Sequence, residues 1–369
     1  MKYYIIAGEA SGDLHAANLM KELRLADSAF SCRAWGGDLM QEQGAELVKH
    51  YRDLAFMGFV EVIANLKTIL ANVAFCKEDI LKYNPDALIL VDYPGFNLRI
   101  AEFAKQKGIK VFYYISPQVW AWKASRVKQI KRNVDRMLTI LPFESDFYKQ
   151  YNYPVTFVGH PLLDAIENRT DSNNILLSSD PRKIIALLPG SRKQEITTVL
   201  PLMLSVTAKF PDYRFIVAAA PSVDKEFYAA VTRNAPVEII YGKTYDLLAA
   251  AHAALVTSGT ATLEAALFGV PEVVCYKGNV VSYHIARRLI KVKYISLVNL
   301  IMDREIVKEL IQDDLISGSI SAELEKICSE GPERQKMIDD YKALKKVLGG
   351  KGASARAAHT IVADLKLKN

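Results

Sequence analysis

The segment SGTATLE, residues 258–264, combines residue types that suit the binding of a nucleotide. It follows an apolar run, AALV, and begins a stretch with helical spacing. Ser258 and Gly259 would form the turn, and Thr260 would cap a helix whose first N–H groups and positive end attract a diphosphate. Glu264, about one turn further on, could accept hydrogen bonds from both ribose hydroxyls. A capped helix with a surface glutamate is the structural alternative, but the flanking apolar runs favour the nucleotide site.

A second loop, LLPGSR at residues 187–192, repeats this pattern of strand, turn and helix. Gly190 permits close approach of the backbone, Ser191 supplies a hydroxyl, and Arg192 can bind a phosphate in bidentate fashion. An ordinary capped helix is the alternative here too. A basic residue at a helix N-terminus is unfavourable unless an anion compensates it, which favours an anion site.

Asp92, in VDYPGFN, follows an apolar strand and is the first candidate for a general base. A carboxylate that caps the next helix is equally compatible with the sequence, so both interpretations stay open. AGEASGD, residues 7–13, adds Glu9, Ser11 and Asp13 to the same set of strand-end loops. His160, in GHP, is the one histidine at a strand end, where a structural histidine is the usual finding. Glu9, Asp13 and His160 are the next candidates for the base after Asp92.

Several kinds of site are not indicated by the sequence. It contains neither GxGxxG nor GxxxxGK[ST], and no clustered metal-ligand spacing such as HExxH, so we expect no metal and no cofactor. The cysteines are far apart, as expected for reduced thiols in a cytosolic protein: Cys32, Cys76, Cys275 and Cys328. The net charge of +6 is weak evidence for an anionic partner. No signal peptide and no membrane span are predicted.

Two segments could meet lipid. Residues 54–75 form an apolar stretch led by Phe56, Met57 and Phe59, and this stretch is either core or a face for acyl chains or a membrane. WAWKASRVKQIKR, from residue 120, is either a solvated helix or a basic aromatic rim against anionic lipid. Its aromatic and basic residues are Trp120, Trp122, Lys123, Arg126, Lys128, Lys131 and Arg132.

The elements that must position these loops are short apolar strands alternating with helices. YYIIA, ALILV and VFYYI are examples before residue 165, and KIIALL, RFIVAAA and ALVT after it. A polar, turn-rich stretch separates the two series, and the chain after about Met302 shows helical, charged segments without strong strand signals. The pattern predicts an α/β protein with two Rossmann-like, doubly wound domains facing across a cleft. We expect domains at residues 1–165 and 166–345, and a C-terminal helix within 346–369 that could pack back on the first.

The motifs together resemble one family, the lipid-A-disaccharide synthases, inverting glycosyltransferases of the GT-B type (family 19). The segments that carry the resemblance occur in the family's order over nearly the whole chain: AGEASGD, MGFVEV, VDYPGFN, SPQVWAWKASRV, LPFE, GHPLLD, LLPGSR, SGTATLE and YISLVNL. SGTATLE alone would indicate only a GT-B enzyme that uses a nucleotide sugar.

The resemblance implies that UDP-2,3-diacylglucosamine and 2,3-diacylglucosamine 1-phosphate give a β(1→6) disaccharide phosphate and UDP, in a Gram-negative bacterium. Asp92 matches the family's base or acceptor-orienting aspartate, Arg192 its PGSR arginine, and Glu264 its ribose-binding glutamate. Asn299, in SLVNL, matches an asparagine near the donor. Gly95 stands where many members have a second aspartate, which puts the acceptor contacts of this chain in doubt.

Further expectations follow from the resemblance. It implies a peripheral protein on the cytoplasmic face of the inner membrane, as a homodimer, with no nucleic-acid partner. The nearest enzymatic alternatives are a lipid II-type glycosyltransferase and a UDP-sugar 2-epimerase. A two-domain solute-binding protein is the alternative from another class, and it would normally be exported.

Overall fold

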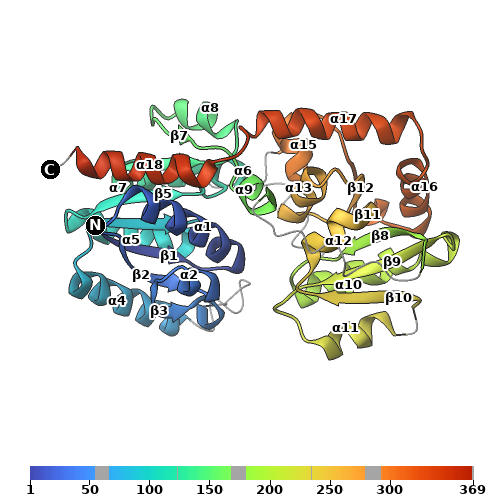
Figure 1. Cartoon of the computed structure of the whole chain (residues 1–369), viewed down its shortest axis with the longest axis horizontal. Coiled ribbons are helices and arrows are strands. Elements are labelled where there is room, and N and C mark those ends of the chain that lie inside the picture. Colours follow the sequence, from blue (N-terminus) through green and yellow to red (C-terminus); the bar gives the residue numbers. More distant parts are fainter. Residues whose placement is uncertain (55–65, 123, 168–179, 234, 279–291, 368–369) are drawn as a thin grey trace. The chain divides into compact units, whose positions relative to one another are not determined.

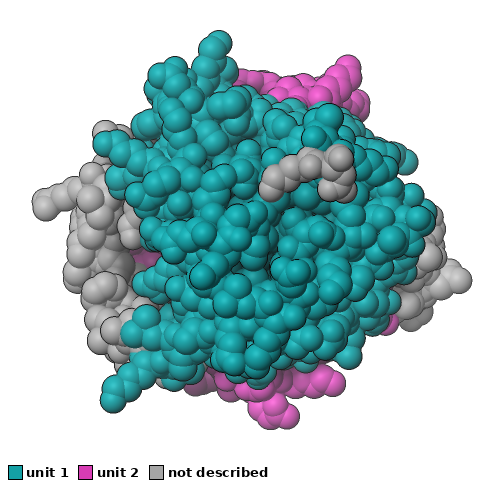
Figure 2. All heavy atoms as spheres, turned by 90° about the vertical axis from the view of Figure 1, so that its left-hand side faces the viewer, with its two compact units in different colours: residues 1–168, 348–369 teal, residues 169–347 magenta. Residues whose placement is uncertain are grey.

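The computed structural model describes residues 1–54, 66–122, 124–167, 180–233, 235–278 and 292–367. The chain divides into two compact units, coloured separately in Figure 2. Unit 1 comprises Met1–Asn168 and Leu348–Asn369, and unit 2 comprises Arg169–Val347. Phe56, Met57 and Phe59 lie outside the described residues, so their predicted contact with lipid stays a prediction.

Unit 1 is built on a parallel sheet of seven strands in the order β3-β2-β1-β4-β5-β6-β7. The central strands are buried along nearly their whole length, which explains why they consist of continuous apolar runs rather than alternating ones. The strands are β1 (Lys2–Ala7), β2 (Ser31–Gly36), β3 (Glu46–His50), β4 (Ala87–Val91), β5 (Lys110–Tyr114), β6 (Arg136–Thr139) and β7 (Thr156–Phe157).

Helices lie between these strands along the chain, and their apolar faces bury a core around Tyr4, Trp35, Phe96 and Tyr113. The α-helices are α1 (Ala10–Ala26), α2 (Asp38–Glu42), α4 (Leu66–Tyr83), α5 (Pro94–Gln106), α6 (Val119–Trp122), α7 (Val127–Asn133), α8 (Glu144–Lys149), α9 (Leu162–Glu167) and α18 (Ala353–Lys366). The 3₁₀ turns are η1 (Tyr51–Leu54) and η2 (Ala124–Arg126).

The last helix, α18, belongs to unit 1 although unit 2 precedes it in the chain. It packs along α1, as Figure 1 shows in red and blue. Arg136 of β6 makes a bidentate pair with Asp364 of α18, with both N–O distances 2.8 Å. Asp164 of α9 accepts hydrogen bonds from the backbone N–H groups of Gly352 and Ser354 at the start of α18. A helix from the end of the chain thereby completes the N-terminal unit.

Unit 2 has a parallel sheet of six strands in the order β10-β9-β8-β11-β12-β13. Its strands are β8 (Lys183–Leu188), β9 (Tyr213–Ala219), β10 (Val237–Tyr241), β11 (Ala251–Thr257), β12 (Glu272–Tyr276) and β13 (Lys308–Ile311). Its helices are α10 (Lys193–Leu204), η3 (Thr207–Lys209), α11 (Lys225–Thr232), α12 (Thr244–Ala250), α13 (Thr260–Leu267), α15 (Leu297–Met302), η4 (Gln312–Asp314), α16 (Ser317–Cys328) and α17 (Pro332–Val347).

Strand β13 lies after Met302, where the sequence shows helical, charged segments and no strong strand signal. Its sequence, KELI, carries two charged residues. Among the described strands it pairs with β12 and lies at the edge of the sheet. Charged residues are common on edge strands, so the apolar pattern that identified the buried strands is missing here.

Both sheets reverse their strand order next to the first strand of the unit. The reversal lies between β1 and β4 in unit 1, and between β8 and β11 in unit 2. Ligands of doubly wound sheets bind beyond the carboxyl ends of the strands at such a reversal. These strands lead into the loops that contain Glu9, Asp92, Arg192 and Ser258, so the fold places the predicted loops at the two switch points.

All four cysteines are buried and unpaired. None of the described helices is both long and apolar enough to cross a membrane.

Candidate functional site

Asp92 lies at the switch point of unit 1 in a constrained turn. Asp92 and Tyr93 both have left-handed backbone angles, with φ of 44° and 49°. The turn is held because the carbonyl oxygen of Asp92 accepts hydrogen bonds from Asn97 Nδ2 at 2.7 Å and Tyr113 Oη at 2.6 Å. Burial raises the pKa of the half-buried Asp92 carboxyl to about 7, and the negative charge of Glu9 contributes to the rise. A carboxylate with such a pKa is a competent base near neutral pH.

Glu9 comes close to Asp92 because Gly8 leaves room for the ring of Tyr93. A Cβ atom on Gly8 would lie 2.4 Å from that ring, so a larger residue would push the loops after β1 and β4 apart. Glu9 is the N-cap residue of α1 by its extended backbone, and its side chain makes no capping hydrogen bond. Ser11, in the first turn of α1, is exposed. Glu9 and Asp92 are therefore two carboxyl groups that interact electrostatically at one switch point.

The carboxylate of Asp13 has a structural task. It is 3% exposed and accepts hydrogen bonds from the N–H groups of Gly37, Leu39 and Met40, at 2.8, 3.2 and 3.2 Å. It thus holds the turn from β2 into α2. Since these contacts occupy both oxygens, we do not carry Asp13 into the proposed substrate site.

His160 is 2% exposed, and its Nδ1 accepts a hydrogen bond from the N–H of Leu162 at 3.2 Å. Burial, with a smaller contribution from neighbouring His15, lowers its pKa to about 3. The ring is therefore neutral near pH 7, with its proton on Nε2. Nδ1 is the ring nitrogen that would have to accept a proton from a substrate, and it already accepts the hydrogen bond from the backbone N–H of Leu162.

The aromatic segment after β5 lies beside a buried carboxyl group that sequence reasoning missed. Trp120 of α6 meets the ring of Phe143 edge to face at 4.9 Å; Trp122 ends α6, and Arg126 ends η2. Glu144, which begins α8, is 1% exposed and accepts N–H groups of Ile140 and Leu141 at 3.1 and 2.9 Å. Burial raises its pKa to about 7. The motif LPFE contained the signal, but sequence reasoning assigned the glutamate no role.

In unit 2, the loop after β8 is shaped by Glu195. Gly190 has a φ of +105°, and a Cβ there would lie 2.6 Å from Glu195 Oε2. The N–H of Ser191 donates to Glu195 Oε2 at 3.3 Å, and Arg192 Nη1 pairs with Glu195 Oε1 at 2.9 Å. The side chain of Arg192 is 58% exposed, so it can leave this ion pair for a stronger anion. Glu195 thus compensates the positive charge of the arginine at the N-terminus of α10, as a bound phosphate would.

The Ser258 turn leads into α13. Gly259, with φ of +141°, is the N-cap residue, so the prediction that Thr260 caps the helix is wrong; Thr260 is its first residue. Glycine is preferred at such a positive φ, and because it has no side chain it cannot cap the free N–H groups of the helix. Thr262 Oγ donates instead to the carbonyl of Gly259 at 2.9 Å. Ser258 Oγ donates to the carbonyl of Ile295 at 2.8 Å.

Glu264 is half-buried on α13 and accepts a hydrogen bond from Tyr245 Oη at 3.1 Å. Burial raises the pKa of Glu264, and the tyrosine hydroxyl partly opposes the rise. Tyr245 orients this carboxylate from α12, and no sequence signal pointed to it.

The side-chain amide of Asn299 uses both of its N–H donors in hydrogen bonds within the protein. It also holds the backbone just before β13. It is fully buried. Its Nδ2 donates to Val307 O and Glu309 Oε1, both at 2.9 Å, while its Oδ1 accepts the N–H groups of Ile306 and Val307 at 2.7 and 3.0 Å. We therefore treat Asn299 as a residue that shapes the segment leading into β13 rather than one that contacts a ligand.

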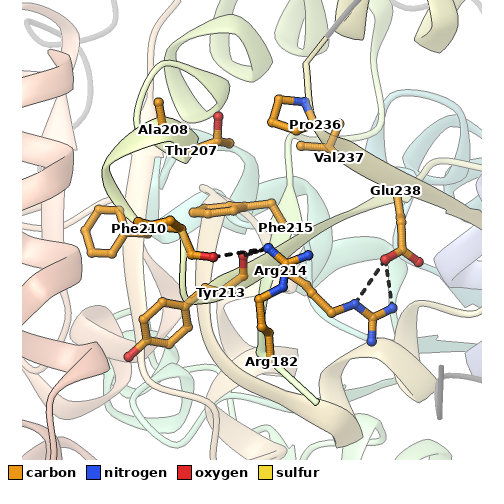
Figure 3. A pocket seen from close by; sticks show the side chains of 11 residues that line it. Arg182, Thr207, Ala208, Phe210, Tyr213, Arg214, Phe215, Pro236, Val237 and Glu238 are labelled. Atoms are coloured by element: carbon orange, nitrogen blue, oxygen red, sulfur yellow. Dashed lines mark hydrogen bonds and ion pairs between the residues drawn. The ribbon is translucent and has the colours of Figure 1, made fainter. Parts of the chain in front are cut away.

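A pocket of about 430 Å³ opens at the other end of the unit 2 sheet, around the first residues of β9 and β10 (Figure 3). Arg214 pairs there with Glu238 at 2.7 Å, and Arg182 with Asp180 at 2.7 Å. Arg182 also donates to the carbonyl of Pro211. Because its charges are already paired and it lies at the amino ends of the strands, this pocket is not our candidate site. Within the ranges that the structure describes, no three His, Cys, Asp or Glu side chains group as a metal site.

Two Rossmann-like units with their loops at the switch points are also the fold of GT-B glycosyltransferases and of UDP-sugar epimerases. A kitacinnamycin glycosyltransferase superposes with a TM-score of 0.69 at 15% identity, covering 98% of both chains. The S. aureus MnaA–UDP complex gives 0.68 at 12% identity, covering 99% of this chain and 97% of that one. The UDP-GlcNAc 2-epimerase of Neisseria meningitidis, bound to UDP-GlcNAc, gives 0.64 at 14% identity and covers both chains fully. At these identities the likeness shows the fold alone.

The sequence identifies the family within this class. Residues 3–362 match the family model described as lipid-A-disaccharide synthetase. The lipid-A-disaccharide synthase of Syntrophus aciditrophicus is 41% identical over 364 residues, covering 96% of this chain and 95% of the relative. That of Trichlorobacter lovleyi is 38% identical over 367 residues, covering 97% and 96%. The chain belongs to the lipid-A-disaccharide synthase family of glycosyltransferases, as its motifs predicted.

Proposed function

We propose that this enzyme transfers 2,3-diacylglucosamine from UDP to 2,3-diacylglucosamine 1-phosphate, forming the β(1→6) lipid A disaccharide phosphate and UDP. Membership of the family supports the overall reaction. The observation that carries the mechanism is Asp92, a carboxyl group with a pKa of about 7 at the switch point of unit 1.

In the proposed step, the 6-hydroxyl oxygen of the acceptor bonds to the anomeric carbon of the donor. The bond from that carbon to the diphosphate oxygen breaks, and its electron pair leaves with UDP. Asp92 takes the hydroxyl proton as the new bond forms, because a sugar hydroxyl is far too weak an acid to ionise by itself near neutral pH. Attack opposite the leaving group inverts the anomeric configuration. If Asp92 is not the base, Glu9 is the next candidate, because it lies at the same switch point, whereas Nδ1 of His160 is occupied.

Unit 2 is the proposed donor unit. The helix starts of α10 and α13, with Ser191, Gly259 and Thr260, would meet the diphosphate, and Arg192 would exchange Glu195 for it. Glu264, oriented by Tyr245, would hold the ribose. The presence of UDP or UDP-GlcNAc in structural neighbours of the same fold supports a nucleotide here. The charge that develops on UDP would be met by these dipoles and by Arg192.

Unit 1 is the proposed acceptor unit, corresponding to residues 1–165 with the helix that follows residue 345. Ser11, Trp120, Trp122 and Arg126 are its proposed contacts with the lipid acceptor, and Phe56, Met57 and Phe59 those with acyl chains or the membrane. The basic and aromatic residues around Arg126 support a peripheral position on the inner face of the inner membrane, and we propose a homodimer there. Gly95 lies in the first turn of α5, and no atom of the described residues lies within 4 Å of the position of a Cβ there. The backbone therefore has room for the aspartate of other members.

One assay tests the reaction. The protein is incubated with UDP-2,3-diacylglucosamine and the monosaccharide 1-phosphate, and products are identified by mass spectrometry. We expect the disaccharide phosphate and one UDP for each disaccharide formed. A parallel incubation without the lipid acceptor should release no UDP and change no sugar configuration. UDP or an epimerised sugar in that incubation would contradict the proposal and favour an epimerase-type activity.

A further inference from the structure

Glu309, on the edge strand β13, collects hydrogen bonds from the segment that leads into α15. Its carboxylate accepts the N–H of Ile295 at 3.0 Å, the N–H of Ser296 at 2.9 Å and the hydroxyl of Ser296 at 2.8 Å. The amide of Asn299 adds a further donor at 2.9 Å. Hydrogen bonds to an ionised acceptor are stronger than neutral ones, so one side chain fixes the course of the backbone through residues 295 and 296.

The same segment is fixed from its other side by α15. Ser296 is the N-cap residue of this helix, and its Oγ accepts the N–H of Asn299 at 3.3 Å while it donates to Glu309. Asn299 in turn holds the backbone of residues 306 and 307, just before β13. Glu309, Ser296 and Asn299 therefore form a closed network.

This network reaches the Ser258 turn through the carbonyl group of Ile295. Ile295 donates its N–H to Glu309 and accepts the hydroxyl proton of Ser258 on its carbonyl oxygen at 2.8 Å. α13 and α15, which follow the two joined segments, lie side by side in unit 2 (Figure 1). Since the hydroxyl proton of Ser258 is used in this bond, Ser258 can only accept hydrogen bonds from a ligand. A diphosphate offers only acceptors, so what Ser258 can contribute is the shape of the turn, whose N–H groups then serve as donors to the diphosphate beside those of the α10 loop and Arg192.

We propose that Glu309 is a positioning residue for the donor site: it holds Ile295 so that Ser258 fixes the Gly259 turn in a conformation that binds the diphosphate of the nucleotide. This inference rests on the donor site under Proposed function and deepens it. Glu309 acts through Ile295 and Ser258 and touches no substrate.

The negative charge of Glu309 and its positioning role affect the affinity for UDP in opposite directions. The carboxylate is negative, like the diphosphate, so removing its charge should by electrostatics alone tighten the binding of UDP. Glu309→Gln keeps the size of the side chain but sets an NH₂ group among the N–H donors of residues 295 and 296. If Glu309 positions the turn, this variant binds UDP more weakly despite the lost repulsion. The direction of the change in affinity separates the two roles.

The test is calorimetric titration with UDP, together with steady-state kinetics for both substrates. We expect Glu309→Gln to raise the Kd of UDP and the KM of the donor about tenfold, with the KM of the acceptor unchanged. Glu305→Gln is the matched control: it removes the same charge nearby, but among the described residues its ion-pair partner is the surface Lys308 at 3.1 Å. The control should bind UDP like the parent.

A double-mutant cycle tests the connection itself. If Glu309 acts through Ser258, then Glu309→Gln added to Ser258→Ala should weaken UDP binding no further, whereas independent effects would multiply. Unchanged or tighter UDP binding by Glu309→Gln, or multiplying effects in the cycle, would overturn the inference while leaving the donor site intact. If the parent protein does not bind UDP, the donor site itself is refuted, and the inference with it. Should Glu309→Gln not fold, Ser296→Ala removes one hydrogen bond to the carboxylate, and unchanged affinity in that variant overturns the inference.

Discussion

Replacing Asp92 with asparagine separates the two roles that this residue could have. Asparagine has nearly the same shape and, like aspartate, tolerates the left-handed backbone that Asp92 adopts at φ of 44°. The hydrogen bonds from Asn97 and Tyr113 go to the backbone carbonyl of residue 92, so the substitution leaves them in place. What the variant loses is the ability to take a proton.

The expected changes in activity and stability have opposite directions. A general base typically contributes about 10²–10⁴-fold, so kcat of Asp92→Asn should fall by about that factor while the affinity for UDP stays parental. The folded-state pKa of Asp92 is raised from 3.8 to about 7, so its protonated form stabilises the fold at low pH, and that stabilisation is lost as the pH rises through about 7. At about 1.4 kcal/mol per pH unit, the buried charge at pH 8 destabilises the fold by at most about 4 kcal/mol. The neutral amide of the Asp92→Asn variant avoids this penalty.

The assay combines turnover with unfolding. We would measure kcat with saturating substrates, the Kd of UDP by calorimetry, and the free energy of unfolding by urea at pH 5 and pH 8. Asp92→Asn should be more stable than the parent at pH 8, and this advantage should shrink at pH 5. Near-parental turnover would refute the assignment of the base and move it to Glu9. Lower stability at both pH values would show that the carboxylate holds the fold instead.

Four further predictions concern the same sites. Glu9→Gln should lower the pKa of the base, because a neighbouring negative charge is removed; the acid limb of the pH profile of kcat/KM should move to lower pH, and an unmoved limb contradicts the coupling. Glu264→Ala should weaken UDP binding by roughly 1.5–3 kcal/mol in calorimetry, and unchanged affinity ends its ribose assignment. Activity should persist in excess EDTA, and strict dependence on added magnesium would contradict a site built on helix dipoles and an arginine. Replacing Phe56, Met57 and Phe59 with serine should reduce flotation with anionic liposomes while UDP binding persists; a misfolded variant would instead place them in the core.

The alternation of apolar strands and helices was sufficient to predict two doubly wound units, and the structural comparisons confirm that fold class. Buried parallel strands are readable because both faces are covered, which makes their sequences continuously apolar. The edge strand β13 was missed for the opposite reason: Lys308 and Glu309 break that pattern at the edge of the sheet formed by the described strands. Thr260 was misplaced by one position because the sequence does not show that Gly259 takes the positive φ that makes it the N-cap.

By itself the sequence determined the fold class, the family and the loops in which chemistry is expected, because these depend on periodicity and on motifs that are contiguous in the chain. Only the tertiary structure decided what the side chains in those loops are able to do. The raised pKa of Asp92 requires burial and the approach of Glu9 from the loop after another strand, and the orientation of Glu264 requires a tyrosine 19 residues away. From the sequence, Asp13 and Asn299 could not be distinguished from residues that contact substrates. In the structure, backbone groups of other segments form hydrogen bonds with their side chains. Hydrogen-bond partners and burial come from chain segments brought together by the sheets, and no local pattern of residues specifies them.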